Sequence, residues 1–296
     1  MRPSTHVLGL TIALAGLSPL TATASSTHPC IAAEFSMNSD ATDLTGNGNN
    51  GSIHGPTSTS DRGSAASSAY AFDGVDDQVT ITKTSTLLAG SGDFTVEVWV
   101  RVDPSGSGGP VIFDYSGLPM YGIDIRSDLT AQFTFRPGSS LGGGCCDPLT
   151  SVIGTTVLND GAWHHIVGTR TGGTANLYVD GLLEVSDTNT GANGYINNNL
   201  CSYTRIGAAY SGGGHCGASV VGSGSFFTGD IDDVRFYNCL LDDTEVATLY
   251  TASPSSAAGA PVGTVPALPP IGLLAMSSLL LVTGALGIRR EHDAER

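Results

Sequence analysis

Three carboxylates stand close together in the segment GDIDDVRFYN, residues 229–238, whose apolar residues otherwise alternate as in a β-strand. Neighbouring side chains of a strand point to opposite faces, so Asp232 is predicted to share a face with Val234 and Phe236. These two residues favour the core, where a carboxylate without a partner is strongly unfavourable. Asp232 therefore needs either a bound cation such as Ca²⁺ or backbone N–H donors from a neighbouring loop.

The other two carboxylates of this segment are given structural roles. Asp233 and Arg235 fall on the opposite face and are predicted to pair at the surface, which contributes little stability. Asp230 precedes the regular part of the strand and is interpreted as a turn residue.

Acid–base catalysis is not predicted, and we expect no enzyme activity. A glycosidase built on strands needs two carboxylates held across the sugar, typically on alternate residues of one strand. Glu97 has no such second carboxylate, and Glu184 is followed only by Asp187. His164 and His165 could act as general bases, but adjacent residues of a strand point to opposite faces, which favours a structural role.

Aromatic residues suggest a sugar-binding surface instead. Trp99 is predicted on the polar face of the strand DFTVEVWVRV, between Glu97 and Arg101. Together with three tyrosines it could form a stacking platform; these are Tyr121, Tyr210 and Tyr237. The alternative is that Trp99 packs beneath a loop or the residues of a second layer.

Short alternating segments dominate the middle of the chain. In DFTVEVWVRV, residues 93–102, every second residue is apolar, and YGIDIRS and AQFTFRP repeat the pattern. The Asp180-Gly181 pair predicts a hairpin turn. Asp242 followed by Glu245 has the spacing of a capping box before one short helix. The sequence therefore predicts an all-β sandwich with a single C-terminal helix in the domain.

Composition limits the class of partner. The 296 residues include 40 Gly and one Lys, and the formal net charge is −15. Nucleic acid binding requires clustered basic residues, so nucleic acid is excluded as a partner. The acidity fits an extracellular or saline setting, or cation binding.

Both ends of the chain are predicted to be targeting segments. Residues 1–24 combine a basic start, an apolar run and the A-x-A cleavage pattern, which predicts a secretory signal peptide. Residues 253–265 are small, Pro-rich and uncharged, as in a linker. Residues 271–288 carry no charge and reach ~27 Å as a helix, enough to span a membrane, with Arg289 and Arg290 on the cytoplasmic side. We expect an exported domain, outside the cytoplasm, with the membrane as a partner through this helix.

The C-terminal 266–296 segment also resembles a known sorting signal. Its VPALPP motif, apolar span and Arg cluster resemble the tripartite signals of the PEP-CTERM kind, although Ala and Leu stand where that motif has Glu. The resemblance implies a processed tail on a bacterial envelope protein; a permanent membrane anchor is the alternative.

Six cysteines lie between the two tails, which in an exported chain predicts disulfides. They are Cys30, Cys145, Cys146, Cys201, Cys216 and Cys239. No spacing of the zinc-site type occurs among them.

Six motifs in order resemble one domain family. DLTGNGNNGSIHG, YAFDGVDDQVTIT, DFTVEVWVRVD, LNDGAWHHIVGTR, ANLYVDG and FTGDIDDVRFYNCLLDDTEVATLY are similar to the laminin G-like jelly-roll domain of the concanavalin A-like lectin/glucanase superfamily. The similarity runs from about Cys30 to Tyr250, within a domain expected over residues 30–252. It implies two antiparallel sheets, a calcium ion in many members, and binding or adhesion more often than catalysis.

The resemblance also implies particular residues. In related domains the Asp that opens the last strand binds calcium together with the first strand and an early loop. This implies Asp232, the region of Glu34 and the Asp73-Gly74 turn, with Asp43 as a further ligand candidate. A hydrogen-bonded Asp232 without calcium stays the alternative.

The same strand pairing predicts one disulfide. If the first and last strands are antiparallel with Glu34 opposite Arg235, then Cys30 lies opposite Cys239. Adjacent Cys145 and Cys146 would then pair with Cys201 and Cys216 in an order that stays open. The predicted function is a secreted or surface-anchored, non-catalytic domain that binds a glycan or glycoprotein, with a structural Ca²⁺. A structural envelope or matrix component is the first alternative and a polysaccharide hydrolase the second.

Overall fold

The computed structural model describes residues 28–82, 84–87, 92–115, 120–136, 150–188, 203–209 and 225–255. The predicted signal peptide and the segment after residue 255 lie outside these ranges, as do Cys145, Cys146, Cys201, Cys216 and Tyr210. No helix within the described ranges has the length and apolar character needed to cross a membrane.

Two antiparallel sheets build the domain, which confirms the predicted sandwich. Across the described residues the first sheet has eight strands and the second has seven. The order in the eight-stranded sheet is β13 (Leu182–Asp187), β12 (Thr174–Val179), β11 (His164–Thr171), β6 (Phe94–Val102), β17 (Thr228–Tyr237), β4 (Ala69–Asp73) and β3 (Thr57–Thr59), with β1 (Ile31–Phe35) also paired to β17.

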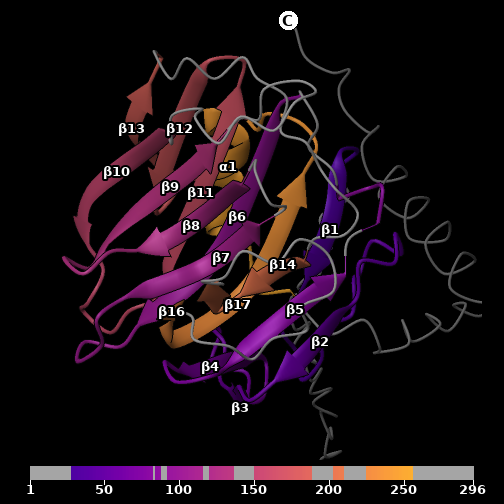
Figure 1. Cartoon of the computed structure of the whole chain (residues 1–296), viewed down its shortest axis with the longest axis vertical. Coiled ribbons are helices and arrows are strands. Elements are labelled where there is room, and N and C mark those ends of the chain that lie inside the picture. Colours follow the sequence, from indigo (N-terminus) through magenta and orange to yellow (C-terminus); the bar gives the residue numbers. More distant parts are fainter. Residues whose placement is uncertain are drawn as a thin grey trace, which may run out of the picture. The chain divides into compact units, whose positions relative to one another are not determined.

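The seven-stranded sheet forms the second layer (Figure 1). Its order is β10 (Thr150–Val157), β9 (Thr130–Arg136), β8 (Met120–Ile125), β7 (Gly109–Tyr115), β14 (Tyr203–Ile206), β5 (Gln78–Thr82) and β2 (Gly51–His54). A separate short pair joins β15 (Ala208–Ala209) to β16 (Ser225–Phe226). The chain crosses between the two sheets several times, and the core consists of side chains from both sheets that meet between the layers.

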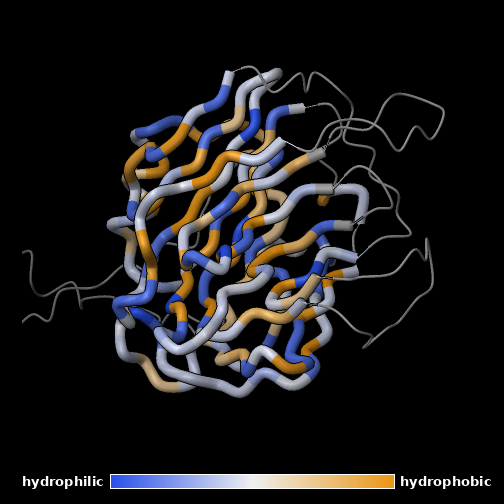
Figure 2. Tube along the Cα trace, turned by 60° about the vertical axis from the view of Figure 1, so that its left-hand side comes forward, coloured by the Kyte–Doolittle hydropathy of each residue, from blue (hydrophilic) through white to orange (hydrophobic). Residues whose placement is uncertain are grey.

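Hydrophobic and hydrophilic residues alternate along many of the strands (Figure 2), and this period of two decides which side chains face the core. Alternate residues of β6 face inward, as predicted: Phe94, Val96, Val98, Val100 and Val102. Phe133 of β9 lies so close to Gly168 of β11 that an added Cβ on the glycine would be 2.3 Å from the ring. The two layers are therefore tightly packed at this point.

A second apolar cluster lies on part of the outer face of the eight-stranded sheet. Helix α1 (Asp243–Thr251) places Val246 against Tyr178 and Val167, with Leu241 beside them. The predicted capping box is present, because Asp242 accepts from the backbone of Glu245 while the Glu245 side chain accepts from the backbone of Asp242.

The strand β17 contains a bulge that the sequence analysis did not predict. Asp233 has φ 44, and the pairing of β17 with β6 shifts between Asp232 and Arg235. The extra residue allows Ile231 and Val234 both to face the core. Asp232 therefore lies on the outer face opposite Trp99, and the prediction that it shares the core face of Val234 was wrong.

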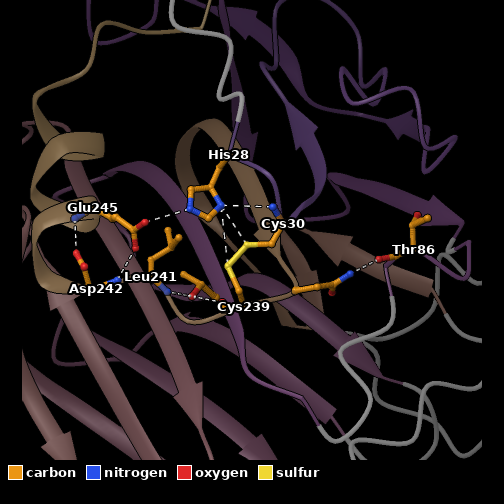
Figure 3. Close-up of a disulfide and its surroundings, with 9 residues drawn as sticks. His28, Cys30, Thr86, Cys239, Leu241, Asp242 and Glu245 are labelled. Atoms are coloured by element: carbon orange, nitrogen blue, oxygen red, sulfur yellow. Dashed lines mark hydrogen bonds and ion pairs between the residues drawn. A yellow bond between two sulfur atoms is a disulfide. The ribbon is translucent and has the colours of Figure 1, made fainter.

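The ends of the domain meet as predicted. Strand β1 pairs with β17 in the register that places Glu34 opposite Arg235. A disulfide joins Cys30 to Cys239, with 6.0 Å between the two Cα atoms (Figure 3). The bond closes a loop of 209 residues and so restricts the unfolded chain strongly.

The packing of β6 yields a stability prediction. Val98→Ala removes two buried carbons and leaves a cavity between the sheets, so we expect the free energy of unfolding to fall by about 2 to 3 kcal/mol. Val157→Ala makes the same change on β10, where the side chain is 52% exposed, and should change it by less than about 0.5 kcal/mol. Urea unfolding of both variants measures this; equal effects would contradict the described packing.

Candidate functional site

A pocket of about 450 Å³ opens where β6 and β17 run side by side. Arg101 and Asp103 from β6 and the turn after it line one part, and Gly229 and Asp230 of β17 line another. Gly161, from the loop before β11, completes the wall. Ala71 and Phe72 of β4 also line it, so four segments far apart in sequence supply the lining, as is common in binding sites at the ends of strands.

An ion pair lies at the centre of this lining. Arg101 and Asp230 are directly opposite each other on β6 and β17, and Arg101 Nε donates to Asp230 Oδ2 over 2.7 Å. Burial raises the pKa of Asp230, while the Arg101 charge acts against that rise. The guanidinium also lies 5.3 Å from the centre of the Trp163 ring. Asp230 is therefore a strand residue with a charged partner, and the turn interpretation was wrong.

Glycine permits the close approach of the two strands at this point. Gly229 has φ 144, and an added Cβ would lie 2.4 Å from the backbone oxygen of Arg101. Gly161 has φ 77 and open space around the position of a Cβ. The pocket thus exposes backbone as well as the charged side chains.

His164 fastens the loop that carries Gly161 and Trp163. Its Nδ1 lies 2.9 Å from Asp180 Oδ2, and its Nε2 lies 3.0 Å from Asp160 Oδ1. The hydrogen bond with Asp180 raises the pKa of His164, burial lowers it, and the bond with Asp160 adds to the rise. A doubly protonated ring donates to both carboxylates, so the charged form is favoured.

The four predicted calcium ligands do not form one site. Among the described residues, no three of Asp232, Asp73, Glu34 and Asp43 bring carboxylate oxygens within 4.8 Å of one another. Asp43 Oδ1 accepts from Thr45 Oγ1 over 2.7 Å, and its Oδ2 accepts from Asn49 Nδ2 over 2.9 Å. These residues do not fit a shared cation, and calcium binding itself stays a prediction.

Asp73 and Asp232 have other neighbours. Asp73 clusters with Asp76 and Asp77 in the turn between β4 and β5. Asp232 lies 3.3 Å from Arg62 Nη1, and its Oδ1 accepts from the backbone N–H of Asp233 over 2.8 Å. Burial, with the charge of Asp233 beside it, raises the pKa of Asp232. Asp232 is therefore held by Arg62 and by the backbone N–H of the next residue in β17, whereas the alternative expected backbone donors from a neighbouring loop.

A buried charge network lies next to Asp232. Arg235 donates from Nε to Glu34 Oε1 over 2.9 Å and from Nη1 to Glu97 Oε1 over 2.8 Å. Burial alone would raise the pKa of Glu97, but the Arg235 charge and hydrogen bonds from His165 and Tyr237 lower it to about 2. The Asp233–Arg235 pair is present at 3.4 Å, yet both side chains are buried, so the predicted surface pair was wrong.

The proposed aromatic platform is not formed by the described aromatic residues. Trp99 is 5% exposed, with Arg62 4.2 Å above its ring centre and the Tyr250 ring of α1 stacked at 5.7 Å. Tyr121 and Tyr237 are also buried. The alternative that Trp99 is covered by another segment is confirmed, and Arg62, which covers it, was not singled out from the sequence.

The chain resembles known proteins in sequence and in fold. A model of the concanavalin A-like lectin/glucanases superfamily matches residues 73–247. The chain belongs to this superfamily. No curated protein matches the sequence.

Solved structures share the superfamily fold at low sequence identity. The binding domain of Paraclostridial Mosquitocidal Protein 1 is 16% identical with a TM-score of 0.57, over 75% of this chain and 52% of that chain. The botulinum neurotoxin serotype G binding domain is 14% identical with a TM-score of 0.53, over 74% of this chain and 50% of that chain. This chain thus spans about half the length of these toxin domains.

A bacterial accessory domain matches over almost its whole length. Domain 4 of an extracellular arabinanase from Geobacillus stearothermophilus, solved with arabinotriose, is 20% identical with a TM-score of 0.51. The match covers 76% of this chain and 98% of that domain. Binding domains therefore recur among the neighbours of this superfamily member.

The network around Arg235 yields a second prediction. Glu97→Gln leaves the buried guanidinium without one of its charged partners, so the free energy of unfolding should fall by about 3 to 5 kcal/mol at neutral pH. Because the folded-state pKa of Glu97 is about 2, the wild type should lose this advantage as pH falls from about 4.5 towards 2. Denaturant unfolding measures both, with the exposed Asp76→Asn as the control; a similar loss in that control would contradict the assignment.

The His164 bridge yields a pH prediction. Because its folded-state pKa is raised, its contribution to stability is complete below pH about 6.5 and is lost as pH rises through the folded-state value. We expect the stability difference between wild type and His164→Gln to shrink over that range in thermal melts. His54→Gln, on the exposed β2, is the control, and a constant difference for His164→Gln would refute this role.

Proposed function

We propose that this chain is an exported, non-catalytic domain that binds a glycan or glycoprotein in the pocket lined by β6 and β17. The observation that carries the proposal is the Arg101–Asp230 pair in the wall of that pocket. Sugar hydroxyls both donate and accept hydrogen bonds, and an adjacent guanidinium and carboxylate offer both functions at one place.

The pocket supplies further contacts of the kind that a sugar uses. Asp230 takes two of the five N–H donors of Arg101, so the others are available to a ligand. Gly229 and Gly161 add backbone to the wall, and the space around Gly161 is open. A few polar groups in a shaped pocket are sufficient to orient a small ligand.

The pocket carboxylates support binding rather than hydrolysis. Asp103 accepts from the backbone N–H and the hydroxyl of Ser105, and these bonds lower its pKa. Asp230 is held by Arg101. A glycosidase needs one carboxyl group that keeps a proton for the leaving oxygen. The lowered pKa of Asp103 does not suit that role, and at Asp230 the Arg101 charge opposes the burial that raises its pKa.

The arabinotriose complex of the bacterial accessory domain supports a carbohydrate ligand for this fold. Export, a membrane anchor and a structural calcium ion complete the proposal from the sequence. The Asp73, Asp76 and Asp77 cluster is the described group of carboxylates in which calcium would be sought first.

The experiment is a glycan array with the full chain, followed by calorimetric titration of the ligands found and of arabino-oligosaccharides. Arg101→Ala and Asp230→Asn should each weaken binding at least about tenfold, since each leaves a polar partner unpaired in the wall. Arg126→Ala and Asp128→Asn alter an exposed Arg–Asp pair outside the pocket wall and should leave affinity unchanged.

Three results would contradict the proposal. A chain that binds nothing on the array would favour a structural envelope or matrix component. Equal loss of binding in the Arg126 and Arg101 variants would place the ligand elsewhere. Release of new reducing ends from a polysaccharide, abolished by Asp230→Asn, would make the protein a hydrolase.

A further inference from the structure

The disulfide that joins the ends of the domain has an imidazole beside it. His28 precedes Cys30 by two residues, and its Nδ1 lies 3.1 Å from Cys30 Sγ and 4.0 Å from Cys239 Sγ (Figure 3). These three atoms all lie within 4.8 Å of one another. One nitrogen and two sulfurs thus converge at the junction between β1 and the end of β17.

The contacts of His28 fix which ring nitrogen carries a lone pair. Nε2 lies 3.1 Å from Oε1 of Glu245, and an ionised carboxylate only accepts, so Nε2 is the protonated donor. The backbone N–H of Cys30 points at Nδ1 over 3.5 Å. Nδ1 is therefore the unprotonated nitrogen, and it faces both sulfurs.

The partner of His28 is itself held in place. Glu245 is the third residue of α1, and its Oε2 accepts from the backbone N–H of Asp242 over 2.8 Å as part of the capping box. Its other oxygen is thereby turned toward the imidazole, as Figure 3 shows. A carboxylate that holds the far nitrogen of a histidine is the usual way in which proteins orient a metal-binding imidazole.

The spacing fits a tetrahedral metal ion once the sulfurs are free. Zinc bonds of about 2.3 Å to sulfur and about 2.0 Å to nitrogen place neighbouring ligand atoms roughly 3.5 to 3.8 Å apart. The two observed nitrogen–sulfur distances lie on either side of this range. We propose that, after reduction of the Cys30–Cys239 disulfide, Cys30, Cys239 and His28 Nδ1 bind a zinc-class divalent cation, with a fourth position open to water.

Reduction of the disulfide and binding of zinc need only a dithiol and the metal ion. A dithiol transfers two electrons and two protons to the Cys30–Cys239 bond, which becomes two thiols while the dithiol closes to its own disulfide. Zinc then replaces the two thiol protons, which are released, and forms two sulfur bonds and one bond to His28.

The two cysteines can be reached from solvent, and an ion bound there would join the ends of the domain. Cys30 and Cys239 are half-buried, and a small pocket of about 190 Å³ lined by His28, Tyr237 and Glu245 opens beside them. The ion would hold the same two ends of the chain that the disulfide holds. The domain could thus keep its closure in reducing surroundings, where the disulfide alone would be lost.

The test uses the full chain with Cys145, Cys146, Cys201 and Cys216 changed to serine, so that their thiols do not bind metal. A phosphine reduces the remaining disulfide: with one water molecule it becomes the phosphine oxide, and the disulfide becomes two thiols. Unlike a thiol reductant, it adds no thiolate that would compete with the protein for zinc. Competition titration measures zinc affinity, and cobalt substitution shows thiolate ligation through its charge-transfer absorption. His28→Gln removes one ligand, and His54→Gln, on the exposed β2, is the matched control.

We expect one zinc ion per reduced chain, no stoichiometric zinc in the oxidised chain, and at least about tenfold weaker binding for His28→Gln than for His54→Gln. Equal binding before and after reduction, or equal affinities of the two variants, would overturn the proposal. If the serine background does not fold, the same two histidine variants are compared in the reduced wild-type chain. In that chain, one tightly bound zinc ion fewer in His28→Gln than in His54→Gln supports the site. Equal zinc stoichiometry and affinity in the two variants refute it.

Discussion

The guanidinium of Arg235 is buried on the outer face of the eight-stranded sheet, between carboxylates of two other strands. Withdrawing these charges from water costs several kcal/mol per ion, which only close pairing and full hydrogen bonding offset. Because β17 lies between β6 and β1, one side chain links three strands through Glu34 and Glu97. The segment after α1 then shields the cluster, since Ser255 hydrogen-bonds to both Arg235 and Glu34. The pairing of the first and last strands and the segment that follows the helix therefore both take part in this network.

Much of the frame could be predicted because it depends on local rules. Alternation located the strands, Asp180-Gly181 located a hairpin whose two residues have φ 51 and 77, and Asp242 located the helix start. Pairing of the first and last strands follows simple arithmetic, so Cys30 and Cys239 could be matched from sequence. The bulge at Asp233 broke the alternation, since a non-glycine residue with positive φ has no reliable signal in one sequence. That single residue moved Asp232 from the predicted core face to the outer face.

The site was less predictable than the frame, because its parts meet only in three dimensions. Arg101 and Asp230 are opposite each other through strand pairing, whereas Gly161 arrives from a loop fixed by His164. Trp99 is an aromatic residue on the polar face of its strand, as a sugar-binding residue would be, yet the Tyr250 ring and Arg62 cover it. An aromatic residue on the polar face of a strand indicates an exposed platform only if no later segment packs over that face. In this chain the helix that does so begins 144 residues downstream of Trp99.

The place of β17 in the sheet governs the order of events during synthesis. This strand is the last in sequence among the described residues, yet it is the neighbour of β6, β4 and β1. Until residue 237 has left the ribosome, β1 and β6 lack the partner between them, and most contacts of the sheet connect distant parts of the chain. Such high contact order makes folding slow and largely post-translational. A nascent chain of this protein therefore lacks the strand between β1 and β6 until residue 237 has been synthesised and released.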